Sequence, residues 1–341
     1  MKKSIFLSFI LCLCLVACIP QQAMAQKQSR MEKLLRYLND NDADKWQKNR
    51  EKLDDETKAY YAEDLSLMDV LNDLWNGQSE QAATLYFGCY EKAAQNNFPS
   101  ICEGEKIPLS QIRDKADQSI INLLEASKDK IPFSRALLDS IHATEYPVDS
   151  AMLQRLQNIR EVALLEGMLK APTPIIYQTY VKEYPNGKFI AQVNASENVR
   201  LYQLVKTTPT PANFKAFFED PEMQKYYQDR GPRPYLAEVR TLYDDFLFQR
   251  IDSLKKEGNA TAIRQIIDDY KNTPYLATGA RTHLNDLEYL SEKADFELLK
   301  PAIVNSESLG LLQEFLKTHK YKEFRDQAKN LRAPFILQAI V

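Results

Sequence analysis

The sequence predicts an all-α protein in which an N-terminal helical region precedes a solenoid of helical hairpins. Three observations support this fold class. Apolar residues recur at helical spacing through most of the chain, and no stretch shows the sustained period-two alternation of a strand. Seven prolines, at positions 108, 132, 147, 172, 185, 209 and 274, stand between these apolar stretches. Only 9 of the 341 residues are glycine, whereas barrels, sandwiches and glycine-rich nucleotide folds use glycine in their tight turns.

The first 25 residues have the composition of a secretory signal peptide. Lys2 and Lys3 precede an apolar stretch from Ile5 to Val16, and small residues follow it up to Ala25. The apolar stretch is shorter than the ~20 residues that a spanning helix needs, and no later stretch reaches that length without charges. We therefore expect an exported protein with no membrane span.

A second interpretation of this segment involves a lipid anchor. The run from Leu15 to Cys18 is similar to a bacterial lipobox, in which cleavage after Ala17 makes the cysteine the lipid-bearing first residue. Several acyl chains on Cys18 would hold the protein at a membrane. Cleavage after Ala25 and lipidation at Cys18 both remain open, and both place the mature protein outside the cytoplasm.

Seven segments are expected to form helices because their apolar residues fall on one face. In the first segment, Met31, Leu34 and Leu38 follow the i, i+3, i+7 spacing of such a face. The other segments are residues 64–75, 81–93, 109–126, 151–169, 235–254 and 324–339.

Prolines mark the helix boundaries because a proline ring lacks the N–H that a helix interior needs. In Thr173-Pro174 and Thr210-Pro211, the threonine is expected to cap a helix that begins at the proline.

The second half of the chain repeats a hairpin pattern. The run Ala171-Pro172-Thr173-Pro174 returns 37 residues later as Thr208-Pro209-Thr210-Pro211. A wider pattern is a short helix with apolar residues at i, i+3 and i+4 and a ring at i+7, followed by a polar loop and a helix that opens with an aromatic residue. The i+7 rings are Tyr184, Tyr270 and His319, and we expect them to pack between the helices of a hairpin. Such hairpins bury their apolar faces by stacking into a solenoid; an irregular helical bundle is the alternative.

The junction from Tyr180 to Phe189, with the sequence YVKEYPNGKF, carries a family resemblance. It resembles the helix-turn-helix junction of tetratricopeptide-type repeats in bacterial envelope proteins, such as the lipoprotein of the outer-membrane β-barrel assembly machinery. The resemblance extends from Ala143 to the C-terminus. It implies a right-handed, tetratricopeptide-like α-solenoid that holds partner proteins at the cell envelope.

Cys89 and Cys102 lie outside the predicted signal peptide, 13 residues apart. In an exported protein such a pair is expected to form a disulfide. The bond would stabilise the fold by ~3 kcal/mol through its effect on the unfolded chain. Two unpaired cysteines are the alternative.

Composition and motifs argue against several function classes. The chain has 44 Lys and Arg against 47 Asp and Glu, a formal net charge of −3, so no basic excess indicates nucleic acid. His142, His283 and His319 are isolated in the sequence, without His-Glu-x-x-His spacing. Neither a Gly-x-Ser-x-Gly motif nor a phosphate-binding loop occurs. We predict no catalytic residue, no cofactor and no metal ligand.

One segment is a candidate surface for a partner. Tyrosine and arginine are enriched at interface hot spots, and proline lowers the entropy that a loop loses on binding. The candidate residues, all between residues 226 and 235, are Tyr226, Tyr227, Arg230, Arg233 and Tyr235. The alternative is an inter-helix connection whose tyrosines pack on the next hairpin.

Together these features predict a signal peptide over residues 1–25, an N-terminal helical region over residues 26–130 and a repeat region over residues 131–341. The expected protein is an exported, non-catalytic scaffold or adaptor, periplasmic or associated with the outer membrane, that binds protein or peptide partners. The alternative is a helical enzyme or binding protein that acts on envelope glycan. A glycan enzyme needs convergent carboxylates in a deep cleft, whereas a scaffold needs an extended apolar and aromatic groove.

Overall fold

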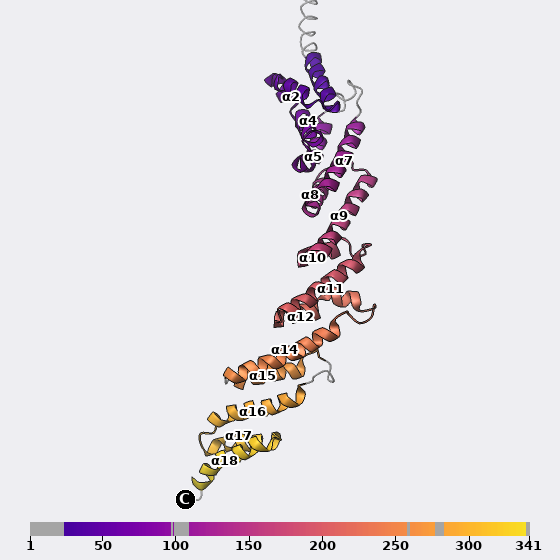
Figure 1. Ribbon diagram of the computed structural model, residues 1–341. Coiled ribbons are helices and arrows are strands. Elements are labelled where there is room, and N and C mark those ends of the chain that lie inside the picture. Colours follow the sequence, from indigo (N-terminus) through magenta and orange to yellow (C-terminus); the bar gives the residue numbers. More distant parts are fainter. Residues whose placement is uncertain (1–23, 97, 99–108, 258–259, 277–282, 339–341) are drawn as a thin grey trace, which may run out of the picture. The chain divides into compact units, whose positions relative to one another are not determined.

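The computed structural model describes residues 24–96, 98, 109–257, 260–276 and 283–338. All regular secondary structure in these residues is helical (Figure 1), which confirms the predicted all-α class for this part of the chain. No helix among them is sufficiently long and apolar to cross a membrane. The predicted signal peptide up to residue 23, including Cys18, lies outside the described residues.

The chain forms two compact units. Unit 1 contains the residues up to Ala171 together with Gln178–Phe189, and unit 2 contains Pro172–Tyr177 together with Ile190–Val341. The boundary predicted between residues 130 and 131 falls within unit 1.

Unit 1 begins with a helix over residues 24–39. Its further helices are α2 (Ala43–Glu51), α3 (Asp55–Tyr60), α4 (Ala62–Trp75), α5 (Glu80–Gln95), α7 (Leu109–Ala126), α8 (Lys130–His142) and α9 (Ser150–Lys170). Helix α4 packs on α5, and α8 packs on both α5 and α9. The helices predicted over residues 64–75, 81–93, 109–126 and 151–169 correspond to α4, α5, α7 and α9.

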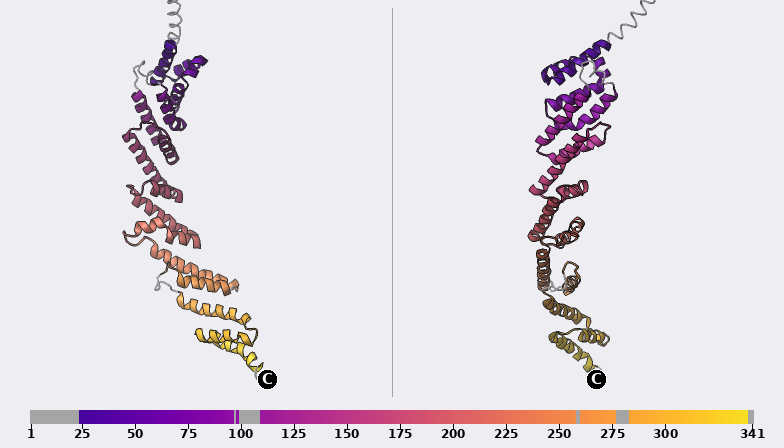
Figure 2. Two further views of the ribbon diagram at one scale, coloured as in Figure 1. Left: turned by 180° about the vertical axis from the view of Figure 1, so that it is seen from behind. Right: turned by 90° about the vertical axis from the view of Figure 1, so that its right-hand side faces the viewer.

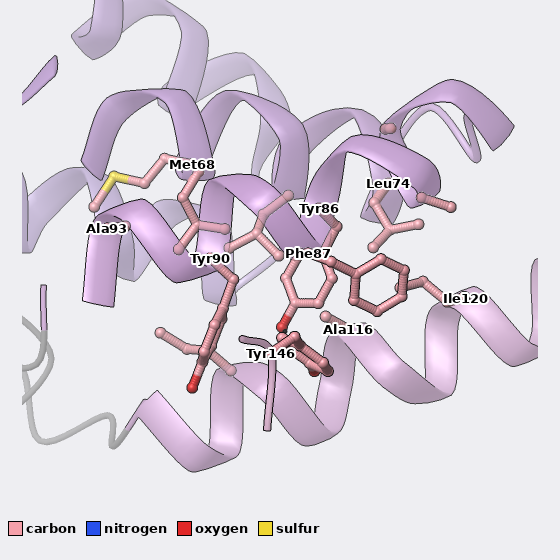
Figure 3. Close-up of a cluster of buried hydrophobic side chains, with 14 of the residues drawn as sticks. Met68, Leu74, Tyr86, Phe87, Tyr90, Ala93, Ala116, Ile120 and Tyr146 are labelled. Atoms are coloured by element: carbon pink, nitrogen blue, oxygen red, sulfur yellow. Dashed lines mark hydrogen bonds between the residues drawn. The ribbon is translucent and has the colours of Figure 1, made fainter. Parts of the chain in front are cut away.

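Aromatic rings dominate one part of the core of unit 1. Tyr86, Phe87 and Tyr90 of α5 surround Tyr146, which precedes α9 in the chain (Figure 3). Their ring centroids lie 5.5, 4.9 and 5.0 Å from that of Tyr146, in edge-to-face geometry. Pairs of this kind stabilise a fold by ~1 kcal/mol beyond their burial. The segment that leads into α9 is therefore fixed against α5.

Unit 2 consists of further helices that follow one another in the chain (Figure 2). They are α11 (Ile190–Thr207), α12 (Pro211–Glu219), α13 (Pro221–Tyr227), α14 (Leu236–Glu257), α15 (Ala260–Asn272), α16 (Leu284–Ala302), the 3-10 turn η2 (Ser306–Ser308), α17 (Leu309–Thr318) and α18 (Lys322–Gln338). Helix α15 packs on both α14 and α16, and α17 packs on α18. Helix α10 (Pro174–Glu183) contributes residues to both units.

The two predicted threonine caps are confirmed. Thr210 Oγ1 accepts a hydrogen bond from the Asn213 amide at 3.2 Å, and α12 begins at Pro211. Thr173 Oγ1 accepts one from the Ile176 amide at 3.3 Å, where α10 begins at the next residue. Each cap satisfies an amide that the first helical turn leaves without a carbonyl partner.

The sequence placed the i+7 rings between the two helices of a hairpin, but their polar atoms contact the long helix that comes before the hairpin. In each hairpin the polar tip of the ring meets the long helix that precedes it in the chain. The three pairs are Tyr184 with the Gln157 carbonyl oxygen of α9 at 3.1 Å, Tyr270 with Asp244 of α14, and His319 Nε2 with Asp295 Oδ2 of α16 at 3.0 Å. A polar contact therefore links each short helix to the long helix before it.

The junction from Tyr180 to Phe189 is closely packed. The Tyr180 hydroxyl donates to Glu161 at 2.8 Å and accepts from the Phe189 amide at 3.1 Å. A Cβ at Gly187 would lie 2.5 Å from both the Tyr180 hydroxyl and a Glu161 carboxylate oxygen. A side chain at this position would therefore displace the Glu161 carboxylate and the Tyr180 hydroxyl, which are hydrogen-bonded to each other.

Candidate partner-binding site

The structure divides the candidate segment between a helix and a loop. Tyr226 and Tyr227 are the last residues of α13, and the connection to α14 runs over residues 228–235. The sequence pattern did not predict α13, whose seven residues are too few for an apolar stripe. The sequence feature that could have indicated this helix is Asp220 directly before Pro221. The aspartate carboxylate accepts a hydrogen bond from the Met223 amide at 2.8 Å, in the same cap geometry as Thr210.

Arg233 holds the loop from inside. Its Nε donates to Asn198 Oδ1 at 2.6 Å, its Nη1 donates to the Phe217 carbonyl, and its guanidinium carbon lies 3.9 Å from the centroid of the Phe217 ring. The Asn198 amide in turn donates to the Pro234 carbonyl at 3.2 Å. Burial lowers the pKa of Arg233, but an arginine stays charged near neutral pH. The side chain therefore anchors the loop to α11 and α12.

The other end of the loop is fixed by stacked rings. Tyr235 lies on Tyr202 of α11, with centroids 4.4 Å apart and planes 11° from parallel. Its backbone has φ +64°, and Gly231 has φ +96°. A tyrosine in the left-handed region is destabilised by ~1 kcal/mol, which the ring stacking offsets.

Arg230 and Tyr226 form a pair on the surface. The Arg230 guanidinium lies 4.4 Å from the Tyr226 ring centroid, and its Nη1 donates to the Tyr226 carbonyl at 2.9 Å. Arg230 is exposed and Tyr226 is half-buried. This cation–π pair leaves the guanidinium accessible to a partner.

A pocket of about 870 Å³ lies beside this loop in unit 2. Phe218 and Tyr275 form an aromatic surface in it, with their rings stacked 4.4 Å apart. The remaining lining residues are Glu219, Pro221, Met223, Gln224, Lys225, Tyr227, Gln228, Gly231, Pro232, Arg233, Leu236, Arg240 and Pro274. Of the five predicted binding residues, the structure thus brings Tyr227 and Arg233 into the pocket lining, whereas Tyr226, Arg230 and Tyr235 lie outside it.

The pocket lining contains two cationic side chains that the sequence did not predict as binding residues. Lys225 of α13 and Arg240 of α14 join Arg233 there. Arg240 Nε donates to the Tyr275 carbonyl at 3.0 Å, and the Tyr275 hydroxyl donates to Glu219. These residues are up to 56 positions apart in the chain, so no local motif connects them. Tyr275 alone had a signal, as the ring that opens a repeat helix.

A second pocket, of about 490 Å³, lies in unit 1, and its lining includes Asp117. Asp117 is buried and accepts a hydrogen bond from the Tyr146 hydroxyl, which lies 3.4 Å from that of Tyr86. Burial raises the pKa of Asp117 to about 6. A carboxyl that titrates near neutral pH in a pocket is a candidate proton donor.

The other carboxylates of this pocket have structural roles. Asp114 pairs with Arg113 at 3.2 Å. Asp149 accepts from the Ala151 amide at 3.1 Å and caps α9. Asp117 also accepts a hydrogen bond, from Tyr146, but it is the carboxyl in this lining whose pKa burial raises.

The structure brings His283 together with two aspartates, although the sequence predicted no metal ligand. His283 Nε2 lies 3.8 Å from an Asp244 oxygen and 3.6 Å from an Asp245 oxygen, and its ring stacks on Phe248. One atom from each of the three residues could face a metal ion, since these atoms lie within 4.8 Å of one another. The same distances suit an ion pair of a protonated imidazole with carboxylates.

The predicted disulfide stays a prediction. Cys89 Sγ lies 3.5 Å from the Ser66 hydroxyl. Cys102 falls outside the described residues.

Comparisons with protein-family models, curated proteins and solved structures give no match to this chain. The assignment of a function therefore depends on the geometry of the pockets.

Proposed function

We propose that the protein is an exported, non-catalytic scaffold or adaptor of the cell envelope that binds a protein or peptide partner. Its hairpins would stack as a right-handed, tetratricopeptide-like α-solenoid. The observation that supports this function best is the pocket of unit 2, which combines an aromatic surface, cationic side chains and a wall held by Arg233.

The wall of this pocket is ordered by contacts within the chain. Arg233 is bonded to α11 and α12, and Tyr235 is stacked on Tyr202. A loop that is already ordered loses little entropy when a partner binds, so more of the contact energy remains as affinity. The volume of about 870 Å³ is in the range of ligand pockets and would hold a few side chains of a peptide.

The test is cross-linking capture from envelope extracts with the full chain. We expect the unaltered protein to capture one stoichiometric partner, and Tyr227→Ala to capture at least about tenfold less, as for loss of an interface hot spot. The matched control is Tyr60→Ala, which removes an exposed tyrosine of α3 in unit 1. Equal capture by the unaltered protein and the Tyr227 variant would contradict binding at this pocket.

A second candidate function, a helical enzyme acting on envelope glycan, is favoured by Asp117 alone. Its pKa of about 6 would let it act as a general acid. The test is release of soluble fragments from purified envelope glycan. Asp117→Asn should abolish release, whereas Asp114→Asn, at the carboxylate paired with Arg113, should retain it. No release by the unaltered protein would remove this candidate.

A further inference from the structure

The pocket of unit 2 has a charge opposite in sign to that of the whole chain. Lys225, Arg233 and Arg240 line it, and Glu219 is the carboxylate in its lining. Glu219 is engaged, since it accepts from the Tyr275 hydroxyl and lies 3.7 Å from Lys215 Nζ. The chain as a whole carries a formal charge of −3. The pocket is thus a local positive region on a slightly acidic protein, and such a region attracts anions.

The pocket cations differ from a buried and a half-buried arginine elsewhere in the chain. Arg160 lies 2.5 Å from Glu183, and Arg200 lies 2.6 Å from Glu197. Among the described residues, no carboxylate lies within ion-pair distance of Lys225, Arg233 or Arg240, and Arg233 Nη2 has no hydrogen-bond partner. Asp220 and Glu197 act on Arg233 only at longer range. Lys225 and Arg240 thus have no ion-pair partner among the described residues, and a bound carboxylate would provide one.

The apolar part of the lining narrows the class of ligand. The stacked Phe218 and Tyr275 rings lie in the same pocket as the exposed Pro221 and Pro274. A small inorganic anion would leave these surfaces in water. A peptide can place carboxylates on the cations and an apolar side chain on the rings at the same time. Both kinds of lining residue are then used.

We propose that this pocket binds an acidic peptide segment of the partner, in which glutamate or aspartate side chains flank an apolar residue. The carboxylates meet Lys225 and Arg240, Arg233 adds to the positive potential from within the wall, and the apolar side chain rests on Phe218 and Tyr275. This inference rests on the proposed function and specifies its ligand.

The test measures binding of short fluorescent peptides to the full chain by anisotropy. The main probe alternates glutamate and leucine and has blocked ends; a second replaces each glutamate by glutamine, and a third replaces each leucine by serine. We expect the glutamate–leucine probe to bind at least about tenfold more tightly than either and to weaken as salt rises. Equal affinity for the glutamate and glutamine probes would overturn the proposal.

Charge-neutralising variants locate the site. Lys225→Gln combined with Arg240→Gln should weaken the glutamate–leucine probe at least about tenfold. The control Lys317→Gln, at an exposed lysine of α17 outside the pocket lining, should leave its affinity unchanged. Circular dichroism and Tm of each variant report whether the fold is retained. Unchanged affinity in the double variant would show that the acidic peptide binds elsewhere and would overturn the proposal.

Two further probes separate other sources of negative charge. The glutamine probe with an unblocked C-terminus tests for a terminal carboxylate, and inorganic phosphate tests for a general anion site. The proposal would be overturned if either competitor displaced the glutamate–leucine probe as effectively as the unlabelled acidic peptide does. If acidic peptides fail while Tyr227→Ala still loses the captured partner, the proposed function stands and this ligand assignment fails. If capture is also independent of Tyr227, both fail.

Discussion

Two inward-directed arginines, one in each unit, show how differently the protein treats a buried cation. Arg160 of unit 1 is only 2% exposed. It donates to both carboxylate oxygens of Glu183 at 2.5 and 2.9 Å, to the Ile131 carbonyl at 2.9 Å and to the Ser134 hydroxyl at 3.1 Å. Arg233 of unit 2 binds an amide oxygen, a carbonyl and an aromatic ring, and the carboxylates of Asp220 and Glu197 act on it only from beyond ion-pair distance.

The difference separates a structural charge from a charge that can also act on a ligand. When a carboxylate of the same fold neutralises an arginine, their fields cancel at short range. When neutral acceptors bind it and the carboxylates lie farther away, more of its field extends into the adjacent pocket. The fold itself thus neutralises the buried Arg160 of unit 1, whereas the half-buried Arg233 of unit 2 anchors a loop and adds positive potential to a pocket.

The largest effect is expected for the paired arginine. Arg160→Met removes one of two donors to the Ile131 carbonyl, which keeps the Ser134 hydroxyl at 3.1 Å, and leaves that hydroxyl without the donor it accepts from. It also removes one of the two cations on Glu183. The free energy of unfolding should fall by about 3–5 kcal/mol, the usual loss for breaking a buried ion pair. Denaturant unfolding measures this. Arg155→Met, which breaks the exposed pair with Glu125, is the control and should lose less than ~1 kcal/mol.

Unit 1 also contains a buried ionisable group without an ion pair, Asp64 of α4. It tests whether the contrast between paired and unpaired groups extends within one unit. Asp64 is fully buried, and neither carboxylate oxygen has a hydrogen-bond partner among the described residues. Burial, and to a lesser degree Glu63, raise its pKa to about 7. Because the folded pKa exceeds the unfolded one, the folded state binds more protons, and stability falls as pH rises through the window between them.

Asp64→Asn should therefore remove a loss of stability of up to about 4 kcal/mol between about pH 4 and pH 8, at ~1.4 kcal/mol per pKa unit. Unfolding free energies of both proteins across this range give the difference. The control is Asp73→Asn, at an exposed carboxyl of the same helix. Its unfolding free energy should depend on pH in the same way as that of the unaltered protein. A profile for Asp64→Asn that parallels the unaltered protein would show that the buried carboxyl titrates normally.

The smallest effect is expected for Arg233→Met. This change removes two hydrogen bonds and breaks no ion pair. The free energy of unfolding should therefore fall by only about 1–2 kcal/mol. It should nevertheless weaken the acidic probe, because the loop loosens and one positive charge is lost. Parallel measurements of Tm and probe anisotropy separate the two effects. A loss of stability as large as that of Arg160→Met would remove the distinction between the two arginines.

Local sequence signals predicted the helices well and the pocket only in part. Thr210 before Pro211 defined the start of α12 because the cap and the proline act within one turn. The i+7 rings were recognisable because a hairpin repeats its own spacing. No local sequence pattern predicted that the pocket would contain Lys225, Arg240 and Tyr275, because these residues belong to separate segments and meet only after packing. Arg233 was identified as a binding residue from its type, but its inward direction depends on Asn198 and Phe217.

The contacts of the i+7 rings have a consequence for how the protein opens. Each ring joins a short helix to the long helix before it, and the core of unit 2 is divided, with one cluster around α14–α16 and another around α16–α18. The buried residues of unit 1 from Met31 to Leu156 instead form one continuous cluster. Hydrogen exchange should thus occur hairpin by hairpin in unit 2 and through a single cooperative opening in unit 1.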